Sequence, residues 1–223
     1  MVKLGTPDVF PPLGVRVEAG PLVLRPITDD LLPELIELAL NGIHEPERMP
    51  FCTPWTDVPD VELSLNYVQY QWGLRANWSR SKWTLEFAVE YDGRLVGCQG
   101  ISTKDYLVTR TGETGSWLGR EFHGQGIGTA MRQAICALCF DHLDAEEITS
   151  AAFLDNPASH GVSRKVGYVA NGVQRAVRRE GEWHASQQLL LTPDAFRRGE
   201  PITVTGVEAF RQFIGLDAPS GPA

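Results

Sequence analysis

The chain has 223 residues, which is long enough for one complete hydrophobic core, so we expect a single compact domain. Lys and Arg number 20 and Asp and Glu number 28, and the resulting formal net charge of −8 argues against a surface that binds DNA or RNA. No apolar run approaches the roughly 20 residues of a membrane-spanning helix, and the first residues lack the apolar stretch of a signal peptide. We therefore expect a cytoplasmic protein that does not bind membranes and that keeps its four cysteines reduced.

The first half of the chain predicts an arm, a strand, two helices separated by an irregular loop, and a β-hairpin. The helices carry apolar residues three or four positions apart, and the hairpin strands alternate apolar and polar residues around an Asp92-Gly93 turn. The expected elements are an arm at 1–20, a strand at 22–26, a helix at 29–41, a loop at 44–59, a helix at 61–78, and strands at 83–91 and 95–101.

The loop at 44–59 places Met49, Phe51 and Trp55 between several prolines. Prolines at this density prevent a regular element but allow an ordered turn-rich segment. We expect these three apolar side chains to line one wall of a substrate pocket.

The predicted helix at 61–78 carries Leu65, Val68 and Trp72 at helical spacing. Apolar and aromatic side chains on the two early helices would favour self-association if they are exposed. The sequence therefore predicts a homo-oligomer.

The second half of the chain predicts alternating strands and helices, which with the hairpin give an α/β (α+β) fold with a mixed sheet flanked by helices. The expected elements are strands at 113–119 and 148–154, helices at 127–142 and 157–167, strands at 168–175 and 183–191, and then a short helix, a strand at 202–204 and a last helix before a frayed end at 217–223. The expected organisation is the arm at 1–20, the domain at 21–192 and a C-terminal extension at 193–223.

Three glycines, Gly124, Gly126 and Gly128, lie between a predicted strand and the first turn of a predicted helix. Glycines let backbone N–H groups approach a phosphate, and a helix N-terminus adds unpaired donors and a positive dipole. Their spacing is neither that of a dinucleotide fold nor that of a P-loop. A simple tight turn with positive φ angles is the alternative explanation.

Three motifs, taken in order, resemble the GNAT acyl-CoA N-acyltransferases, and specifically the RimJ/RimL branch of N-terminal acetyltransferases. The run 123–128 resembles the family's pyrophosphate loop, with His123 where the family has Gln or Arg. The run 155–159 with 164–168 resembles the Asn-x-x-Ser…Gly-Phe/Tyr segment, and 113–118 resembles the acidic-x-Gly-x-Trp-Leu strand. The resemblance covers approximately residues 20–192.

The resemblance implies the GNAT fold, a central sheet splayed between two strands that receives the pantetheine arm of acetyl-CoA or succinyl-CoA, without a metal. The reaction it implies is direct attack of a primary amine on the thioester in a ternary complex, with a small-molecule amine or a protein N-terminus as the acceptor. The residues expected to bind the acyl donor are Trp117, Leu118, Gly119, His123, Gly124, Gln125, Gly126, Ile127, Gly128, Thr129, Asn156 and Ser159.

The resemblance also implies catalytic roles for Glu113, Ser159 and Tyr168. Glu113 would be the general base, and Ser159 or Tyr168 would donate a proton to the departing thiolate. A solvent-facing strand carboxylate, a helix cap and a packing residue are the respective alternatives. Asn156 is likewise explained by capping alone.

Several other features leave alternatives open. Arg178, Arg179 or Arg110 would pair with a carboxylated acyl chain such as succinyl. Cys136 and Cys139 have metal-site spacing but fall within one predicted helix, where burial is the simpler explanation. A non-catalytic acyl-CoA-binding module is the second function class, and a hydrolase, built from His123, His160, Asp155 and Ser159, is a distant third.

Overall fold

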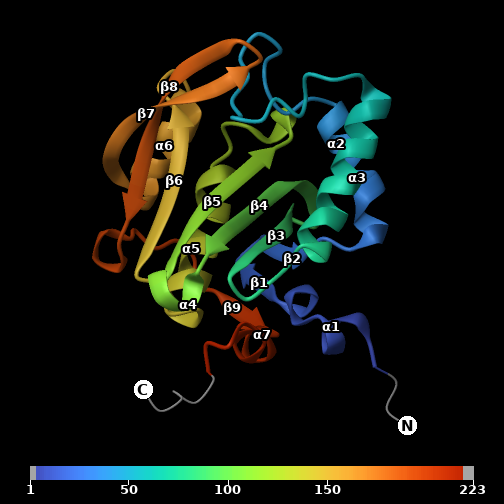
Figure 1. The fold of residues 1–223 in the computed structure, drawn as a ribbon, viewed down its shortest axis with the longest axis vertical. Helices are drawn as coiled ribbons and strands as arrows, with labels where there is room; N and C mark the ends of the chain where they lie inside the picture. The colour runs from blue at the N-terminus through green and yellow to red at the C-terminus, as the bar shows by residue number, and fades with distance from the viewer. Residues whose placement is uncertain (1–3, 218–223) are drawn as a thin grey trace.

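The structure, a computed structural model, describes residues 4–217 and contains one nine-stranded sheet. The strand order is β7-β8-β6-β5-β4-β3-β2-β1-β9, and all neighbours are antiparallel except β5 and β6 (Figure 1). The strands are β1 (Arg16–Ala19), β2 (Leu22–Pro26), β3 (Lys82–Tyr91), β4 (Arg94–Lys104), β5 (Thr111–Leu118), β6 (Glu147–Phe153), β7 (Val169–Arg179), β8 (Glu182–Leu191) and β9 (Thr203–Thr205). This mixed sheet confirms the predicted fold class.

Helices cover both faces of the sheet, with α2 and α3 on one face and α5 on the other (Figure 1). The helices are α1 (Thr6–Val9), α2 (Leu32–Leu40), α3 (Asp60–Ala76), α4 (Tyr106–Thr109), α5 (Ile127–His142), α6 (Pro157–Val166) and α7 (Val207–Ile214). None of the helices in residues 4–217 combines the length and the apolar character needed to cross a membrane.

Local signals placed most elements correctly. The strand at 22–26 and the helix at 127–142 have the predicted bounds. The Asp92-Gly93 turn forms as predicted, with φ angles of 50° and 74°, and Gly167 ends α6 with a φ of 109°. Residues 44–59 form no regular element, as their prolines predict.

The prediction of a loose N-terminal arm is wrong for Arg16–Ala19. This segment forms β1, which pairs with β2 and with β9 from the predicted C-terminal extension. Val15, Val17 and Ala19 are buried and alternate with Arg16 and Glu18, so this segment carries the period of two of a strand over five residues. The arm prediction gave more weight to the prolines and glycines around this short run. The predicted frayed end at 217–223 lies, from residue 218 on, outside the described residues.

Helix α3 forms, but of the three predicted apolar positions only Val68 packs against the core, where it is half-buried. Leu63, Tyr67 and Gln71 are buried. Leu65 is 56% exposed and Trp72 is 52% exposed. The tertiary contacts of Tyr67 with the sheet outweigh the regular spacing of Leu65 and Trp72, which leaves an apolar surface on α3.

The sheet is splayed between β5 and β6, the parallel pair of the described strands. β5 and β6 pair through three residues, Thr111 to Glu113 opposite Glu147 to Thr149, and then part. β5 continues to Leu118 while paired with β4 on its other side. The edge of β5 beyond Glu113 therefore carries backbone groups that no neighbouring strand pairs with.

Candidate active site

The gap between β5 and β6 has a closed end and an open end. Side chains join the two strands at the closed end, where the Thr114 hydroxyl donates to the Thr149 carbonyl at 3.2 Å and the Ser150 hydroxyl donates to the Thr114 carbonyl at 3.3 Å. The open end lies where β5 runs into the glycine turn before α5. A linear ligand can therefore lie in the gap with one end at the glycine turn and the other near Thr114.

The glycine turn has the conformation of an anion cradle. Gly124 and Gly126 have φ angles of 76° and 85°, and a Cβ atom on either would meet no atom within 4 Å. Within residues 4–217, no backbone carbonyl accepts from the N–H groups of residues 124–128. These groups, at the positive end of the α5 dipole, suit a pyrophosphate.

Two side chains of the turn hold its shape. His123 Nε2 lies 3.1 Å from the Leu118 carbonyl oxygen, and the Gln125 amide donates to the Glu121 carbonyl at 2.8 Å. Ile127 is buried, whereas Thr129 is half-buried in the first turn of α5. The strand end at 117–119 leads into this turn through the single 3-10 turn of Arg120–Phe122.

The middle of α6 lies beside the start of α5, since a Cβ atom on Gly128 would lie 3.4 Å from Val162. Asn156 is the N-cap of α6, and its Oδ1 accepts from the Ser159 N–H at 3.1 Å. Capping thus accounts for Asn156 in this structure. The side chains of Asn156 and Ser159 are half-buried, so both retain access to a ligand.

Tyr168 lies inside the protein at the closed end of the gap. Its hydroxyl lies 3.0 Å from Thr114 Oγ1 and 3.5 Å from Cys136 Sγ. Burial, with the Cys136 thiol beside it, raises the pKa of Tyr168 well above its usual value. A phenol with so high a pKa is a weak proton donor, which favours the packing role.

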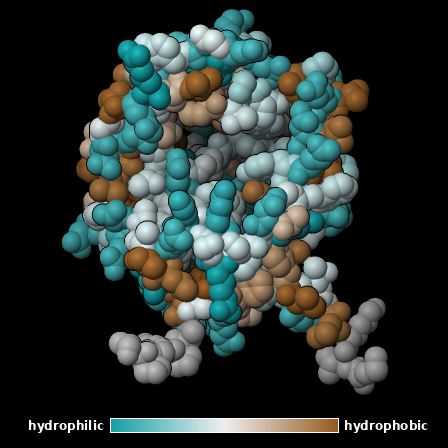
Figure 2. Space-filling view, viewed as in Figure 1, coloured by the Kyte–Doolittle hydropathy of each residue, from teal (hydrophilic) through white to brown (hydrophobic). Residues whose placement is uncertain are grey.

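Glu113 and Trp117 lie on the opposite face of β5, towards α3. The Trp117 ring lies 5.9 Å from Trp55 and 6.3 Å from Tyr67, and Trp55 lies 5.7 Å from Phe51. Glu113 is exposed beside this aromatic cluster. Figure 2 shows a hollow in this face, over the upper part of β5 as oriented in Figure 1.

Met49, predicted to line the pocket with Phe51 and Trp55, is fully buried inside its own loop. The Thr56 hydroxyl donates to Met49 Sδ at 3.9 Å and lies 2.7 Å from His44 Nε2. Phe51 and Trp55 are half-buried and remain available to line a pocket. Met49 thus stabilises the loop from inside.

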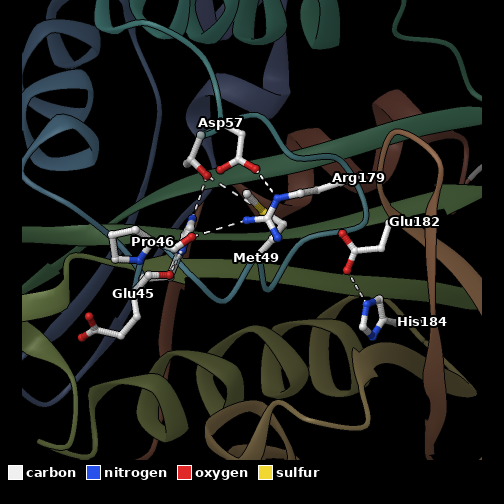
Figure 3. Close-up of polar contacts among 9 residues, drawn as sticks. Glu45, Pro46, Met49, Asp57, Arg179, Glu182 and His184 are labelled. Carbon is white, nitrogen blue, oxygen red and sulfur yellow. Dashed lines mark hydrogen bonds and ion pairs between the residues drawn. The ribbon is translucent and has the colours of Figure 1, made fainter.

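The loop at 44–59 is fastened to the β7–β8 hairpin (Figure 3). The Arg179 guanidinium donates to Asp57 Oδ2 at 2.6 Å and to the Pro46 carbonyl at 3.4 Å. We call this the Asp57–Arg179 clasp. It ties together two segments that are far apart in the chain and that flank the gap.

Two of the three arginines suggested for a carboxylated acyl chain are paired with carboxylates of this chain. Arg178 is buried against the Phe153 ring and donates to both carboxylate oxygens of Asp155, at 2.8 and 2.5 Å. Arg179 belongs to the clasp. Arg110 precedes β5, where its guanidinium lies 5.9 Å from the Tyr106 ring and its Nη1 has no hydrogen-bond partner among residues 4–217. Arg178 and Arg179 therefore have no free guanidinium to pair with an acyl carboxylate.

Sequence reasoning missed Arg132 on α5. It is 5% exposed, and its guanidinium donates to Ser116 Oγ on β5 and to Ser150 Oγ on β6, both at 3.1 Å. It therefore bridges the gap. The only signal in the sequence is a charged residue between Met131 and Ile135, on a face of α5 that is otherwise buried.

Two competing sites do not form. Among residues 4–217, no three His, Cys, Asp or Glu side chains group as metal ligands, and Cys136 and Cys139 are buried free thiols within α5. His160 Nε2 lies 3.0 Å from the Phe153 carbonyl oxygen, so it is not paired with Ser159. The hydrolase arrangement is therefore absent from the described part of the chain.

The sequence model of the acetyltransferase (GNAT) domain matches residues 21–169. The chain belongs to the GNAT acetyltransferase family. This confirms the resemblance carried by the three motifs, and the glycine turn and splayed strands described above fall within the matched GNAT region or at its edge.

Individual relatives are similar to parts of this GNAT chain. The Bacillus subtilis (strain 168) protein named "Putative ribosomal N-acetyltransferase YdaF" is 31% identical over 91 residues, which are 41% of this chain and 49% of that protein. The match thus spans about half the length of that relative. Mycobacterium smegmatis RimJ in complex with CoA-disulfide has a TM-score of 0.66 and 20% identity, covering 90% of this chain and 92% of its own.

A second solved structure is RimL, described as a ribosomal L7/L12 α-N-protein acetyltransferase in complex with coenzyme A. It has a TM-score of 0.65 and 18% identity, and it covers 79% of this chain and 97% of its own. At these identities the two structures share the fold with this chain.

Proposed function

We propose that this chain is an acyl-CoA-dependent N-acyltransferase that moves an acetyl group from the CoA thioester to a primary amine. The observation that carries the proposal is the glycine turn with free N–H groups at the open end of a gap between two parallel strands. The donor lies with its pyrophosphate at residues 123–129 and its pantetheine arm along residues 117–119. Asn156 and Ser159 contact the arm from the start of α6.

The chain's main contribution to the reaction is to hold the amine against the thioester, because a thioester is already activated. Glu113, exposed on the α3 side of β5, takes the proton from the amine directly or through water. Phe51 and Trp55 line the acceptor side. Ser159 is the better placed of the two predicted proton donors, since the Tyr168 hydroxyl is buried and bonded to Thr114.

The acceptor we propose is a protein N-terminus, because the similar proteins RimL and YdaF are named for ribosomal N-acetylation. A small-molecule amine is the second candidate. Acetyl-CoA is the favoured donor over succinyl-CoA, since Arg178 and Arg179 already pair with Asp155 and Asp57.

Donor binding is tested by thermal unfolding with CoA, acetyl-CoA and succinyl-CoA. A ligand at about 100 times its Kd adds about 2.7 kcal/mol to the free energy of unfolding, which is readily measured. Stabilisation supports the site, and its absence with all three ligands would refute it. Transfer to a peptide N-terminus, followed by mass spectrometry, then separates the enzyme from a non-catalytic CoA-binding module.

Glu113→Gln tests the proton transfer. We expect kcat to fall about a hundredfold, because general base catalysis contributes roughly 10²–10⁴-fold, while CoA affinity stays the same. Glu146→Gln, an exposed carboxylate before β6, is the control and should retain wild-type kcat. Unchanged kcat in Glu113→Gln would exclude Glu113 as the base.

We also propose a homo-oligomer and a cytoplasmic setting. The exposed α3 side chains Val61, Leu65 and Trp72 support self-association, and four free cysteines suit a reducing compartment. Light scattering of the wild type and of Leu65→Glu tests the first point. A monomer at all concentrations would contradict it.

A further inference from the structure

Arg132 carries a buried positive charge for which the described residues provide no counter-ion. The guanidinium has no carboxylate within 4 Å in residues 4–217, and its Nε–H has no partner. Of its five N–H donors, two bond to serine hydroxyls. A guanidinium stays charged even when buried, so this arrangement is costly unless an anion joins it.

The side chains that the described residues place against Arg132 are neutral: Ser116, Ser150, Tyr168 and Cys136. The guanidinium lies 5.9 Å from the Tyr168 ring and near Cys136, whose pKa burial raises to about 11. Ser116 and Ser150 fix it by one bond to each strand. The guanidinium is thus fixed by hydrogen bonds, positively charged, and without a paired carboxylate among residues 4–217.

The position of Arg132 in the gap indicates which part of a donor it would meet. Arg132 is five residues into α5, about 7.5 Å along the helix from the N-terminus that suits the phosphates. Ser116 lies three residues, about 10 Å, before Gly119 on β5. Both measures place the guanidinium towards the closed end, where the acyl end of a donor bound at the glycine turn would stop.

We propose that Arg132 receives the thiolate of CoA as the thioester breaks, an inference that rests on the proposed acyl-CoA site. The amine nitrogen bonds to the carbonyl carbon, the C–S bond breaks, and its electron pair stays on sulfur. The nitrogen loses its proton to the carboxylate base on the α3 side of β5. The guanidinium balances the new negative charge, so the sulfur need not be protonated in the step that breaks the bond.

This role explains why the nearby phenol is not needed as an acid. Tyr168 is held by Thr114 and Cys136, and its raised pKa makes proton transfer to a thiolate unfavourable. A fixed cation stabilises the leaving group without moving a proton. The base and the leaving-group cation then lie on opposite faces of β5, because Glu113 and Ser116 alternate across the strand.

The test compares CoA with desulfo-CoA, which lacks the sulfur, from pH 6 to pH 9. Beside a guanidinium the thiol pKa falls, as it does for activated cysteines, so CoA should gain about tenfold over desulfo-CoA as pH rises. In Arg132→Gln the ratio of the two affinities should stay flat. The thiolate's ultraviolet absorbance in the complex provides a second readout.

Arg132→Gln should also lower kcat with acetyl-CoA about a hundredfold, while its affinity for desulfo-CoA stays unchanged. Arg132→Lys, which keeps a positive charge, should have a kcat between those of Arg132→Gln and the wild type. Gln133→Ala is the matched control, because Gln133 donates to the Arg197 carbonyl at 2.9 Å, away from the gap. Retained desulfo-CoA binding shows that each variant is folded and that the proposed donor site stands.

Three results would overturn the proposal. They are a flat wild-type ratio, a pH dependence that survives in Arg132→Gln, and a rate loss confined to succinyl-CoA. The last would make Arg132 the partner of an acyl carboxylate. Failure of both CoA and desulfo-CoA to bind wild-type protein would instead refute the proposed function.

Discussion

The two sides of the gap are built in different ways. The proposed donor side is a nearly continuous stretch, from the end of β5 through the glycine turn into α5, and it offers backbone N–H groups. The proposed acceptor side brings together the loop at 44–59, α3 and the β7–β8 hairpin, and it offers rings and charged side chains. A common donor can be held by fixed backbone geometry, whereas the acceptor side can change with its side chains.

If the donor side works through backbone geometry, a single Cβ atom should damage it most. Gly126→Ala places a methyl group in the cradle. It also forces a residue with a side chain to adopt a φ of 85°. We expect CoA affinity to fall about thirtyfold by calorimetry, with a stability loss of about 1–3 kcal/mol from backbone strain.

Gly93→Ala is the matched control for that variant. Gly93 has a φ of 74° and equally open surroundings, but it lies in the β3–β4 turn away from the gap. It should lose similar stability and keep wild-type CoA affinity. Equal losses of CoA affinity in the two variants would mean that backbone strain, and not a methyl group in the cradle, weakens CoA binding.

The acceptor side should make the free energy of unfolding depend on pH more than the backbone cradle does, because the acceptor side carries Glu86. This half-buried β3 carboxyl faces Tyr67 and Tyr70 of α3 and Cys98 of β4, and desolvation raises its pKa to about 8. The folded state then holds a proton that the unfolded state releases above pH 4.5, so stability falls as pH rises from about 4.5 to 8.

Glu86→Gln should remove this dependence. Its free energy of unfolding should match the wild type near pH 4.5 and exceed it by about 2 kcal/mol near pH 8, since one pKa unit corresponds to about 1.4 kcal/mol and partial exposure reduces the full effect. Denaturant titrations at both pH values measure this. Glu34→Gln, an exposed carboxylate on α2, should leave the pH profile unchanged.

The donor side was largely predictable from the sequence because its signals are local. The glycines before α5 and the Asn156-Pro157 start of α6 lie within a few residues of the structure they determine. Three motifs in order then supported the family. The same locality explains why the hairpin turn and α5 were placed with accurate bounds.

The missing parts depend on distant partners. β1 is a strand because β2 and β9 flank it, and Met49 is internal because Thr56 and the rest of its loop enclose it. The position of Arg132 in the gap is set by β5 and β6, whose Ser116 and Ser150 accept its hydrogen bonds. For Met49 and Arg132 no local pattern in the sequence carries these relations, whereas β1 does show a short alternation of apolar and polar residues.

The smallest expected effect concerns the clasp, which is the longest-range link on the acceptor side. Asp57 and Arg179 are each about one-third exposed, so their pairing is worth about 0.2–1 kcal/mol. Asp57→Asn should loosen the loop and raise the KM for the acceptor about threefold, with donor affinity unchanged. Asp141→Asn, which breaks a similar 2.5 Å pair with Arg198 elsewhere on the surface, is the control. If Asp57→Asn changed CoA affinity and left the acceptor KM unchanged, the clasp would serve donor binding. The donor and acceptor sides would then not be separate parts of the structure.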